Sequence, residues 1–261
     1  MEFDKQYGPW AIIAGASEGT GREFAIQIAK KGIPSLLIAR REAPLNELVT
    51  YIKQQTGVTC ISACIDLSSD NAFETIVSVI GDREVGLFVG NAGADPNGSH
   101  FLNKPIENWI SLVNRNLLTT MQCCHHFGGL MRARGRGGLI LVGSGAGYGG
   151  GSYMATYSAA KAFDICFSES LWRELKPEGI NVLHLVLTTT DTPAFRKLLQ
   201  EKGKKPPRML ASPEKVVAVA LQHLDKGPIY NWGQLMGLRA WWRRTRVNIV
   251  SAISAKMVFD D

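Results

Sequence analysis

Two side chains in the second half of the chain have the types and the spacing of an acid–base pair. Tyr157 and Lys161 are four residues apart, so in a helix they lie one turn from each other on the same face. A phenol has a pKa of about 10 in water, and a neighbouring ammonium lowers that pKa because it favours the phenolate. Thirteen residues before Tyr157, Ser144 ends an apolar run, 138–144, that reads as a buried strand. A carbonyl held between the two hydroxyls could take a proton from Tyr157 as a hydride arrives.

The spacing Tyr-x-x-x-Lys is a weak signal by itself, because many helices carry a surface tyrosine and lysine at this distance. A site for a hydride donor strengthens it, and the start of the chain is patterned as one. The apolar run 10–14 leads into Gly15-Ala16-Ser17-Glu18-Gly19-Thr20-Gly21 and then into an amphipathic segment, 22–31. Glycines between a strand and a helix let the backbone approach a pyrophosphate, and the helix N-terminus offers free amides and a positive dipole end.

Strands and helices alternate along the rest of the chain. Apolar runs predict further strands at 35–39, 59–65, 85–89, 138–144 and 181–187, with a brief edge strand at 228–230. Helices are predicted at 44–56, about 68–80, 106–134, 152–176 and 213–224. This alternation predicts an α/β fold, a Rossmann-type doubly wound parallel sheet with helices on both faces. No repeat, low-complexity tract or linker divides the chain, so residues 1–261 are expected to form a single nucleotide-binding domain.

Two segments depart from this regular pattern. Residues 188–211 are charged and contain prolines, which predicts a substrate-loop region with a short helix. Residues 232–261 mix Trp241, Trp242 and several arginines with apolar residues in helical periodicity, which predicts a C-terminal helical extension. We expect that extension to pack over the substrate side or against a neighbouring subunit. Contact with an anionic membrane surface is the weaker alternative.

The order of the motifs resembles that of the short-chain dehydrogenase/reductase family, over nearly the whole chain to about residue 193. The chain departs from the family pattern at Ala14, where a threonine is usual, and at Leu187-Thr188, where a Pro-Gly is usual. The matching residues are Gly15, Gly19 and Gly21 of the glycine motif, Asp66 and Leu67 of the adenine-contacting pair, Asn91-Ala92-Gly93 of the Asn-Ala-Gly turn, and Asn116, Ser144, Tyr157 and Lys161 of the catalytic tetrad.

The resemblance implies a role for each of these residues. Tyr157 is expected to act as the acid in reduction and the base in oxidation, Lys161 to hold the nicotinamide ribose, and Ser144 to orient the carbonyl. Asn116 is expected to hold a water that connects Lys161 to solvent, which explains an asparagine inside a predicted helix. Thr192 falls where a hydroxyl contacts the nicotinamide carboxamide. The expected cofactor-binding residues are Gly15, Ser17, Glu18, Thr20, Gly21, Arg40, Arg41, Asp66, Leu67, Asn91, Ala92, Gly93, Tyr157, Lys161, Thr190 and Thr192, with no metal.

The end of the second strand predicts NADP(H) rather than NAD(H) as the cofactor. A fold that selects NAD places a carboxylate there to accept hydrogen bonds from the ribose, but this chain has Ala39 followed by Arg40 and Arg41. A guanidinium holds a phosphate through two parallel charge-assisted bonds, and Ser17 can add a hydroxyl donor. Glu18 stands where some NADP-using relatives carry a basic residue, which favours a moderate preference. The alternative is that both arginines are simply solvated at the sheet edge.

Composition limits the remaining possibilities. The formal net charge of +6 over 261 residues is too small to argue for nucleic acid as a partner. No apolar run approaches the roughly 18 residues that span a bilayer, and the charged residues 1–6 do not form a signal-peptide core, so we expect a cytoplasmic protein. The five cysteines have neither metal-ligand nor redox spacing and are expected to be buried free thiols.

Two functions of different class remain open. The first is an oxidoreductase that moves a hydride between NADP(H) and a ketone or secondary alcohol. A glycine-rich floor and an apolar lid of Phe195, Leu198 and Leu199 favour a bulky, hydrophobic carbonyl substrate. The second is a dinucleotide-binding sensor or scaffold without catalysis, which the intact tetrad disfavours because a sensor does not need the acid. The family resemblance also implies a homodimer or homotetramer built on the helices 106–134 and 152–176.

Overall fold

The computed structural model describes residues 2–187, 189–201, 203–207, 210–232, 245 and 248–249. The helical extension predicted for 232–261 lies almost entirely outside the described residues, as does Thr188 of the Leu187-Thr188 departure. None of the described helices combines the length and the apolar character that a membrane crossing requires.

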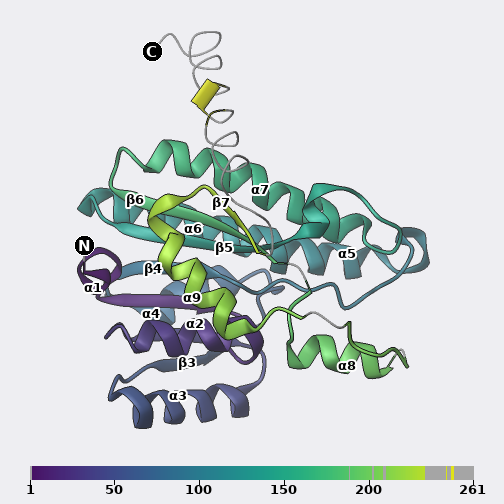
Figure 1. The fold of residues 1–261 in the computed structure, drawn as a ribbon, viewed down its shortest axis with the longest axis horizontal. Coiled ribbons are helices and arrows are strands. Elements are labelled where there is room, and N and C mark those ends of the chain that lie inside the picture. Colours follow the sequence, from purple (N-terminus) through teal and green to yellow (C-terminus); the bar gives the residue numbers. More distant parts are fainter. Residues whose placement is uncertain are drawn as a thin grey trace.

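Within the described residues, a seven-stranded parallel sheet forms the centre of the protein (Figure 1). The strand order is β3-β2-β1-β4-β5-β6-β7, so the chain moves outward from β1 to β3 and then returns to the other side of β1 at β4. Ligands of such sheets bind beyond the carboxyl ends of the strands at this reversal. The strands are β1 (Trp10–Ala14), β2 (Ser35–Ala39), β3 (Ile61–Cys64), β4 (Val85–Gly90), β5 (Gly137–Ser144), β6 (Ile180–Leu187) and β7 (Ile229–Asn231).

Helices cover both faces of the sheet because successive strand residues point to opposite sides. Ile13 packs into the core beneath α2, α3 and α9, whereas Ile12 packs into the core beneath α4, α6 and α7. Figure 1 shows α5 and α8 at the same end of the molecule. The helices are α1 (Phe3–Tyr7), α2 (Gly19–Ala29), α3 (Glu42–Thr56), α4 (Ala72–Ile80), α5 (Ile106–Val113), α6 (Thr119–Arg134), α7 (Ala155–Leu175), α8 (Pro193–Glu201) and α9 (Pro213–His223).

The predicted α/β fold is confirmed, and each predicted strand is present with small differences at its ends. The single helix predicted for 106–134 is wrong, because a π-helical segment, Asn114–Leu118, separates α5 from α6. The side-chain amide of Asn116 donates to the Leu112 carbonyl, 3.0 Å away and one turn back, and that of Asn114 donates to Ser68 O at 3.3 Å. Side-chain bonds of this kind compete with the regular helical ladder.

The expectation that all five cysteines are buried is also wrong. Cys60, Cys123 and Cys124 are buried, but Cys64 and Cys166 are exposed. Cys64 lies on β3, which is the edge strand of the sheet, and Cys166 lies on an outward-facing position of α7.

Position 143 of β5 requires a glycine because the neighbouring strand, β6, lies too close for a side chain. A Cβ atom on Gly143 would overlap Nε2 of His184, which is fully buried in β6. We expect Gly143→Ala to lower the free energy of unfolding by about 1–3 kcal/mol, because an added methyl group in a filled core forces its neighbours apart. Urea unfolding measures this change. Gly149→Ala is the matched control, since a Cβ there meets no atom of the described residues within 4 Å. Equal unfolding midpoints for the two variants would contradict the prediction.

Candidate active site

The four residues predicted to be catalytic come from three elements that meet at the carboxyl end of β5. Ser144 is the last residue of β5, Asn116 lies in the π segment, and Tyr157 and Lys161 lie near the start of α7. The π segment packs against α7. The Ser144 hydroxyl accepts a hydrogen bond from Ala146 N at 3.2 Å and therefore keeps its own proton to donate. The fold thus gathers these elements at one end of the sheet.

Lys161 is held in a buried corner between α7 and β5. Its Nζ donates to the Val142 carbonyl at 3.1 Å and to Oδ2 of Asp164 at 3.0 Å. A Cβ atom on Gly93 would lie 2.8 Å from this Nζ and 2.6 Å from Oδ1 of Asn116. Gly93, Asn116 and Lys161 are therefore brought together, although they are far apart in the sequence.

Asp164 is a residue of this site that the sequence reasoning missed. Lys161 is 2% and Asp164 4% exposed, so the ion pair between them is almost entirely removed from water. Burial raises the pKa of the Asp164 carboxyl, and the Lys161 ammonium opposes that rise. The spacing of the two residues, three apart on a helix, is the signal that could have indicated the pair.

Asn116 carries an unpaired acceptor beside Lys161. Its Nδ2 bonds to Leu112 O, but its buried Oδ1 has no hydrogen-bond partner among the described residues. Buried polar atoms of native proteins are nearly always paired with protein or with ordered water. The predicted role of Asn116, to hold a water next to Lys161, stays a prediction, and Oδ1 is the atom to which that water would donate.

The glycine loop between β1 and α2 is tied to the end of β4. Gly15 and Gly19 have positive φ, +80° and +57°, a conformation that side chains disfavour. Asn91 accepts a 2.7 Å hydrogen bond from the Thr20 hydroxyl and donates one of 2.9 Å to Gly15 O. A Cβ on Gly21 would overlap the Gly15 carbonyl. The loop therefore presents bare backbone and the first amides of α2 at the carboxyl end of the sheet.

The segment after β6 packs against this loop. A Cβ on Gly19 would lie 2.8 Å from Cγ2 of Thr192, and the Thr192 hydroxyl accepts a 3.2 Å hydrogen bond from the backbone N of Phe195 at the start of α8. Thr190 forms an isolated parallel bridge with Ala211, so the substrate loop predicted for 188–211 leaves and rejoins the fold at one place. Thr190 and Thr192 thus lie at the base of that loop.

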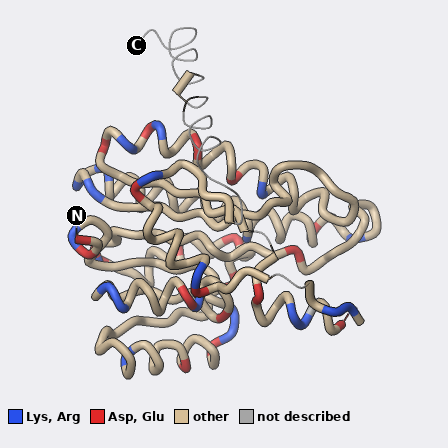
Figure 2. The backbone as a smooth tube through the Cα atoms, in the orientation of Figure 1, with Lys and Arg blue, Asp and Glu red and all other residues tan. Residues whose placement is uncertain are grey.

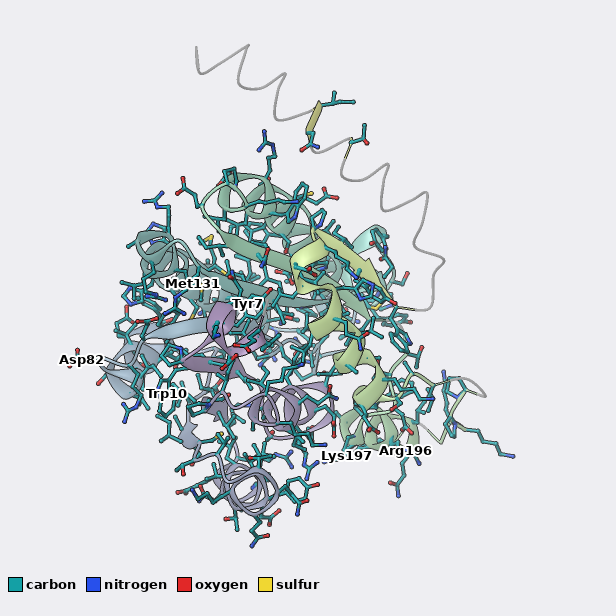
Figure 3. All side chains as sticks on the ribbon, turned by 60° about the vertical axis from the view of Figure 1, so that its left-hand side comes forward. Tyr7, Trp10, Asp82, Met131, Arg196 and Lys197 are labelled. Atoms are coloured by element: carbon teal, nitrogen blue, oxygen red, sulfur yellow. The ribbon has the colours of Figure 1, made fainter. Side chains whose placement is uncertain are left out.

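The outer part of the substrate loop is basic and exposed. Arg196 pairs with Asp191 through two contacts of 2.5 and 2.7 Å, and this pairing lowers the pKa of the Asp191 carboxyl. Arg196 and Lys197 lie at the periphery of the molecule (Figure 3). Further lysines, Lys204 and Lys205, follow α8, and Figure 2 shows basic residues on and after that helix. Of the predicted apolar lid, Phe195 and Leu199 are half-buried.

The residues predicted to bind the adenosine part of the cofactor differ in the contacts that they make. Arg40 is exposed after β2, whereas Arg41 forms a 2.7 Å ion pair with Glu18 of the glycine loop. The carboxylate of Asp66 accepts two hydrogen bonds from Ser68, from its N at 3.0 Å and its Oγ at 2.7 Å. These bonds and the nearby Arg40 outweigh partial burial and lower the pKa of Asp66.

Leu67 and Ala92 hold backbone positions near the same end of the sheet. Leu67 is buried, and its carbonyl accepts a 2.9 Å hydrogen bond from Thr119 at the start of α6. Ala92 contacts Gly15, because a Cβ on that glycine would lie 2.9 Å from the Ala92 Cα. Ser17 stands in the loop between β1 and α2.

Two aromatic residues near Ser144 are fixed by contacts that the sequence did not reveal. The Tyr148 hydroxyl donates to Oδ1 of Asn231 on β7 at 2.5 Å. The Tyr153 ring lies against the ring of His100, with 4.2 Å between their centroids, and Tyr153 has a positive φ of 69°. The loops before α5 and before α7 therefore meet at His100 and Tyr153.

A known protein family and several known proteins are similar to this chain. A family model described as short chain dehydrogenase matches residues 9–203. A 7beta-hydroxysteroid dehydrogenase of Clostridium sardiniense is 30% identical over 238 residues, which cover 90% of this chain and 89% of the relative. A very-long-chain 3-oxoacyl-CoA reductase of Laccaria bicolor is 36% identical over 187 residues, which cover 70% of this chain. The chain spans about half of that relative, because this alignment covers 55% of its length.

Solved structures show the same fold. One from a study of 7beta-hydroxysteroid dehydrogenase stereoselectivity has a TM-score of 0.81 and 27% identity and covers 99% of this chain and 95% of its own. A short-chain dehydrogenase from Sphingobium yanoikuyae, in complex with NADPH, has a TM-score of 0.81 and 23% identity, with coverage of 95% and 96%.

Proposed function

The chain belongs to the short chain dehydrogenase family, and we propose that it is an NADP(H)-dependent oxidoreductase that moves a hydride between the nicotinamide and a ketone or secondary alcohol. The observation that supports this most directly is the position of the Lys161 ammonium. It lies in one buried corner with Gly93 and Asn116, one helical turn from Tyr157. A protein that only sensed the dinucleotide would have no chemical use for this assembly.

The glycine loop fits the pyrophosphate of such a cofactor. Side chains are absent at Gly15, Gly19 and Gly21, and α2 begins at Gly19, so its free amides and positive dipole end face the loop. Thr192 contacts Gly19, which supports its proposed place beside the nicotinamide end. When bound, the cofactor supplies or accepts the hydride.

The residues of the chain supply the proton and the positioning. In reduction, the Tyr157 hydroxyl gives its proton to the carbonyl oxygen, and the Ser144 hydroxyl donates a hydrogen bond that orients that oxygen. Lys161 keeps a third N–H after bonding to Val142 O and Asp164, and this donor is available to the nicotinamide ribose or to a water on Asn116. Oxidation of an alcohol uses the same groups in reverse.

The preference for NADP(H) rests on the end of β2. Ala39 offers no carboxylate to bind the ribose 2′-OH, and Arg40 follows it as an exposed cation. Arg41 is already paired with Glu18, so Arg40 is the better of the two arginines to meet a 2′-phosphate. Ser17 is placed in the glycine loop and can add a hydroxyl donor.

We expect Arg40→Ala to lower kcat/KM for NADPH by roughly 10- to 100-fold, which is the value of a lost charge-assisted hydrogen bond. The kcat/KM for NADH should stay within about twofold. Steady-state kinetics with both cofactors measures the ratio, and Arg132→Ala serves as the matched control because Arg132 is an exposed arginine in the last turn of α6, just before β5 begins. If the wild-type protein prefers NADH, or if Arg40→Ala leaves the ratio unchanged, Arg40 does not hold the phosphate.

For the substrate, we propose a bulky and hydrophobic carbonyl compound. The segments around the site expose apolar side chains: Leu102 is 90% exposed, and Tyr153 and Met154 are exposed before α7. The Nε1 of Trp109 donates a 2.9 Å hydrogen bond to Phe101 O, and this bond holds the backbone of the segment that carries Leu102. The two relatives are named for a hydroxysteroid and a very-long-chain 3-oxoacyl-CoA, and each of these compounds has a large apolar part.

A carbonyl panel tests the proposed function. Purified protein with NADPH is given a steroid ketone, a long-chain 3-oxoacyl thioester and a small ketone such as cyclohexanone, and the loss of absorbance of the reduced cofactor is followed. We expect turnover of at least one large substrate and little turnover of the small one. Tight NADPH binding without turnover of any compound would instead favour a non-catalytic sensor.

We also propose a homodimer or homotetramer built on α5, α6 and α7. These helices leave apolar surface uncovered: Leu130 of α6 is exposed, and Phe163 and Phe167 of α7 stack at 5.2 Å while remaining partly exposed. A second copy would bury this surface. Light scattering at micromolar concentration is expected to give a mass of two or four chains, and a monomeric mass would contradict the proposal.

A further inference from the structure

Arg115 places a guanidinium near the strand ends that are predicted to bind the adenosine. It does so from the side of the sheet that α6 covers, whereas α2 and α3 cover the other side. It lies in the π segment between Asn114 and Asn116. Its Nη2 donates to the carbonyl of Ala94 at 3.2 Å, and Ala94 follows the Asn-Ala-Gly turn at the end of β4. The side chain is half-buried, so it is not an ordinary solvated surface arginine. One of its five donors is used by Ala94, and four remain.

The charges around Arg115 come from the ends of three strands. Burial and the neighbouring Arg40 lower the pKa of Arg115, whereas Asp66 and Asp95 oppose that change. Arg40 follows β2, Asp66 follows β3 and Asp95 follows β4. Geometry places the two arginines at the same strand ends: Asn114 of the π segment donates to Ser68 O and Thr119 donates to Leu67 O, so this segment lies against the chain after β3, beside the end of β2 where Arg40 stands. Two cations held together in this way are stabilised by an anion that binds between them.

The nearby carboxylates are directed elsewhere. Oδ1 of Asp66 accepts both hydrogen bonds from Ser68, and Oδ1 of Asp95 accepts a 2.8 Å bond from Asn97 N. None of the ion pairs found among the described residues includes Arg40 or Arg115. Arg41 differs, because Glu18 neutralises it at 2.7 Å. Arg40 and Arg115 thus have no ion-pair contact among the described residues, although Asp66 and Asp95 lie near enough to favour the charge of Arg115.

We propose that Arg115 and Arg40 together bind the 2′-phosphate of NADP(H), so that Arg115 is a second residue that selects this cofactor. The inference rests on the proposed NADP(H) dependence. A phosphomonoester carries nearly two negative charges and three acceptor oxygens, enough to engage both guanidiniums at once. The adjacent Asp66 and Leu67, predicted to contact the adenine, place the adenosine at the same strand ends.

Binding of nucleotide fragments tests the proposal without any turnover. Isothermal titration calorimetry compares 2′,5′-ADP, which carries the 2′-phosphate, with 5′-AMP, which lacks it. We expect Arg115→Met to weaken 2′,5′-ADP binding by about 10-fold or more and 5′-AMP binding by less than about threefold. Arg115→Lys keeps the positive charge but not the paired donors of the guanidinium, so its affinity for 2′,5′-ADP should fall by an intermediate amount. Arg132→Met is the matched control, because Arg132 is an exposed arginine in the last turn of α6, just before β5 begins, and it should change neither affinity by more than about threefold.

Three results would overturn the proposal, and they are distinguishable. If Arg115→Met weakens both fragments equally, Arg115 contacts the shared nucleotide or supports the fold. If the wild-type protein prefers 2′,5′-ADP and Arg115→Met keeps that preference, Arg40 acts without Arg115. If the wild-type protein does not distinguish the fragments, the NADP(H) preference itself fails. Thermal melting of each variant shows whether it is folded. If Arg115→Met is unfolded, the affinities of Arg115→Lys for the two fragments decide the question instead.

Discussion

Replacement of Tyr157 by phenylalanine is expected to lower kcat by about 10²–10⁴-fold, the usual contribution of a positioned proton donor. The change removes one oxygen and leaves the ring, which packs against Trp109, Leu112 and Ala160. Fold and cofactor affinity should therefore remain close to those of the wild-type protein. Single-turnover kinetics with the best substrate of the carbonyl panel measures the loss, and titration of the cofactor measures its binding.

Tyr153→Phe is the matched control for this variant. Tyr153 lies near Ser144 in sequence but has no lysine four residues later, and its ring is engaged with His100. We expect its kcat to fall by less than about tenfold. Turnover of Tyr157→Phe at the wild-type level would remove Tyr157 from the role of acid.

Replacement of Lys161 by methionine should abolish most turnover and also destabilise the protein in a pH-dependent way. The variant leaves Asp164 buried without its cation, and breaking a buried pair by removing one partner costs about 3–5 kcal/mol. Burial already raises the pKa of Asp164 while Lys161 is present, and without Lys161 that pKa rises further. Denaturant unfolding at several pH values measures both effects.

The direction of the pH effect follows from proton binding. With its pKa raised in the folded state, Asp164 retains a proton that the unfolded chain releases above about pH 4. The stability of Lys161→Met should therefore fall as the pH rises from about 4 through the folded pKa, more steeply than that of the wild-type protein. The double variant Lys161→Met/Asp164→Asn should recover stability and lose this dependence. A Lys161→Met curve parallel to that of the wild-type protein would show that the pair is not coupled as the geometry indicates.

The sheet could be predicted from the sequence because its strands are buried on both faces. Runs such as Leu36-Leu37-Ile38 are continuous and apolar, which is typical of parallel strands covered by helices. The glycine motif and the Tyr157–Lys161 spacing could be found for a similar reason: each is a local pattern whose geometry is set within one loop or one helix.

The interactions that the sequence did not reveal join distant parts of the chain. In the π segment, the Asn114 and Asn116 side-chain amides donate to the carbonyls of Ser68 and Leu112. The periodicity of a predicted helix does not indicate such bonds. Arg115 belongs to none of the sequence motifs, and its hydrogen bond to the Ala94 carbonyl depends on how the π segment packs against the end of β4. The contact between His100 and Tyr153 likewise depends on how two loops fold over the end of the sheet.

The bridge between Thr190 and Ala211 separates the loop between these residues from the rest of the fold, and the two parts can change independently. The chain between the two residues leaves the fold and returns at one point, so its ends stay fixed whatever lies between. Lengthening a loop of this kind is inexpensive, because each doubling adds only about 0.6 kcal/mol of closure entropy. Insertions and replacements beyond Thr192, which itself packs against Gly19, can therefore accumulate during evolution without disturbing the sheet or the glycine loop. Related chains can in this way exchange one molecular target for another while they retain the same chemistry.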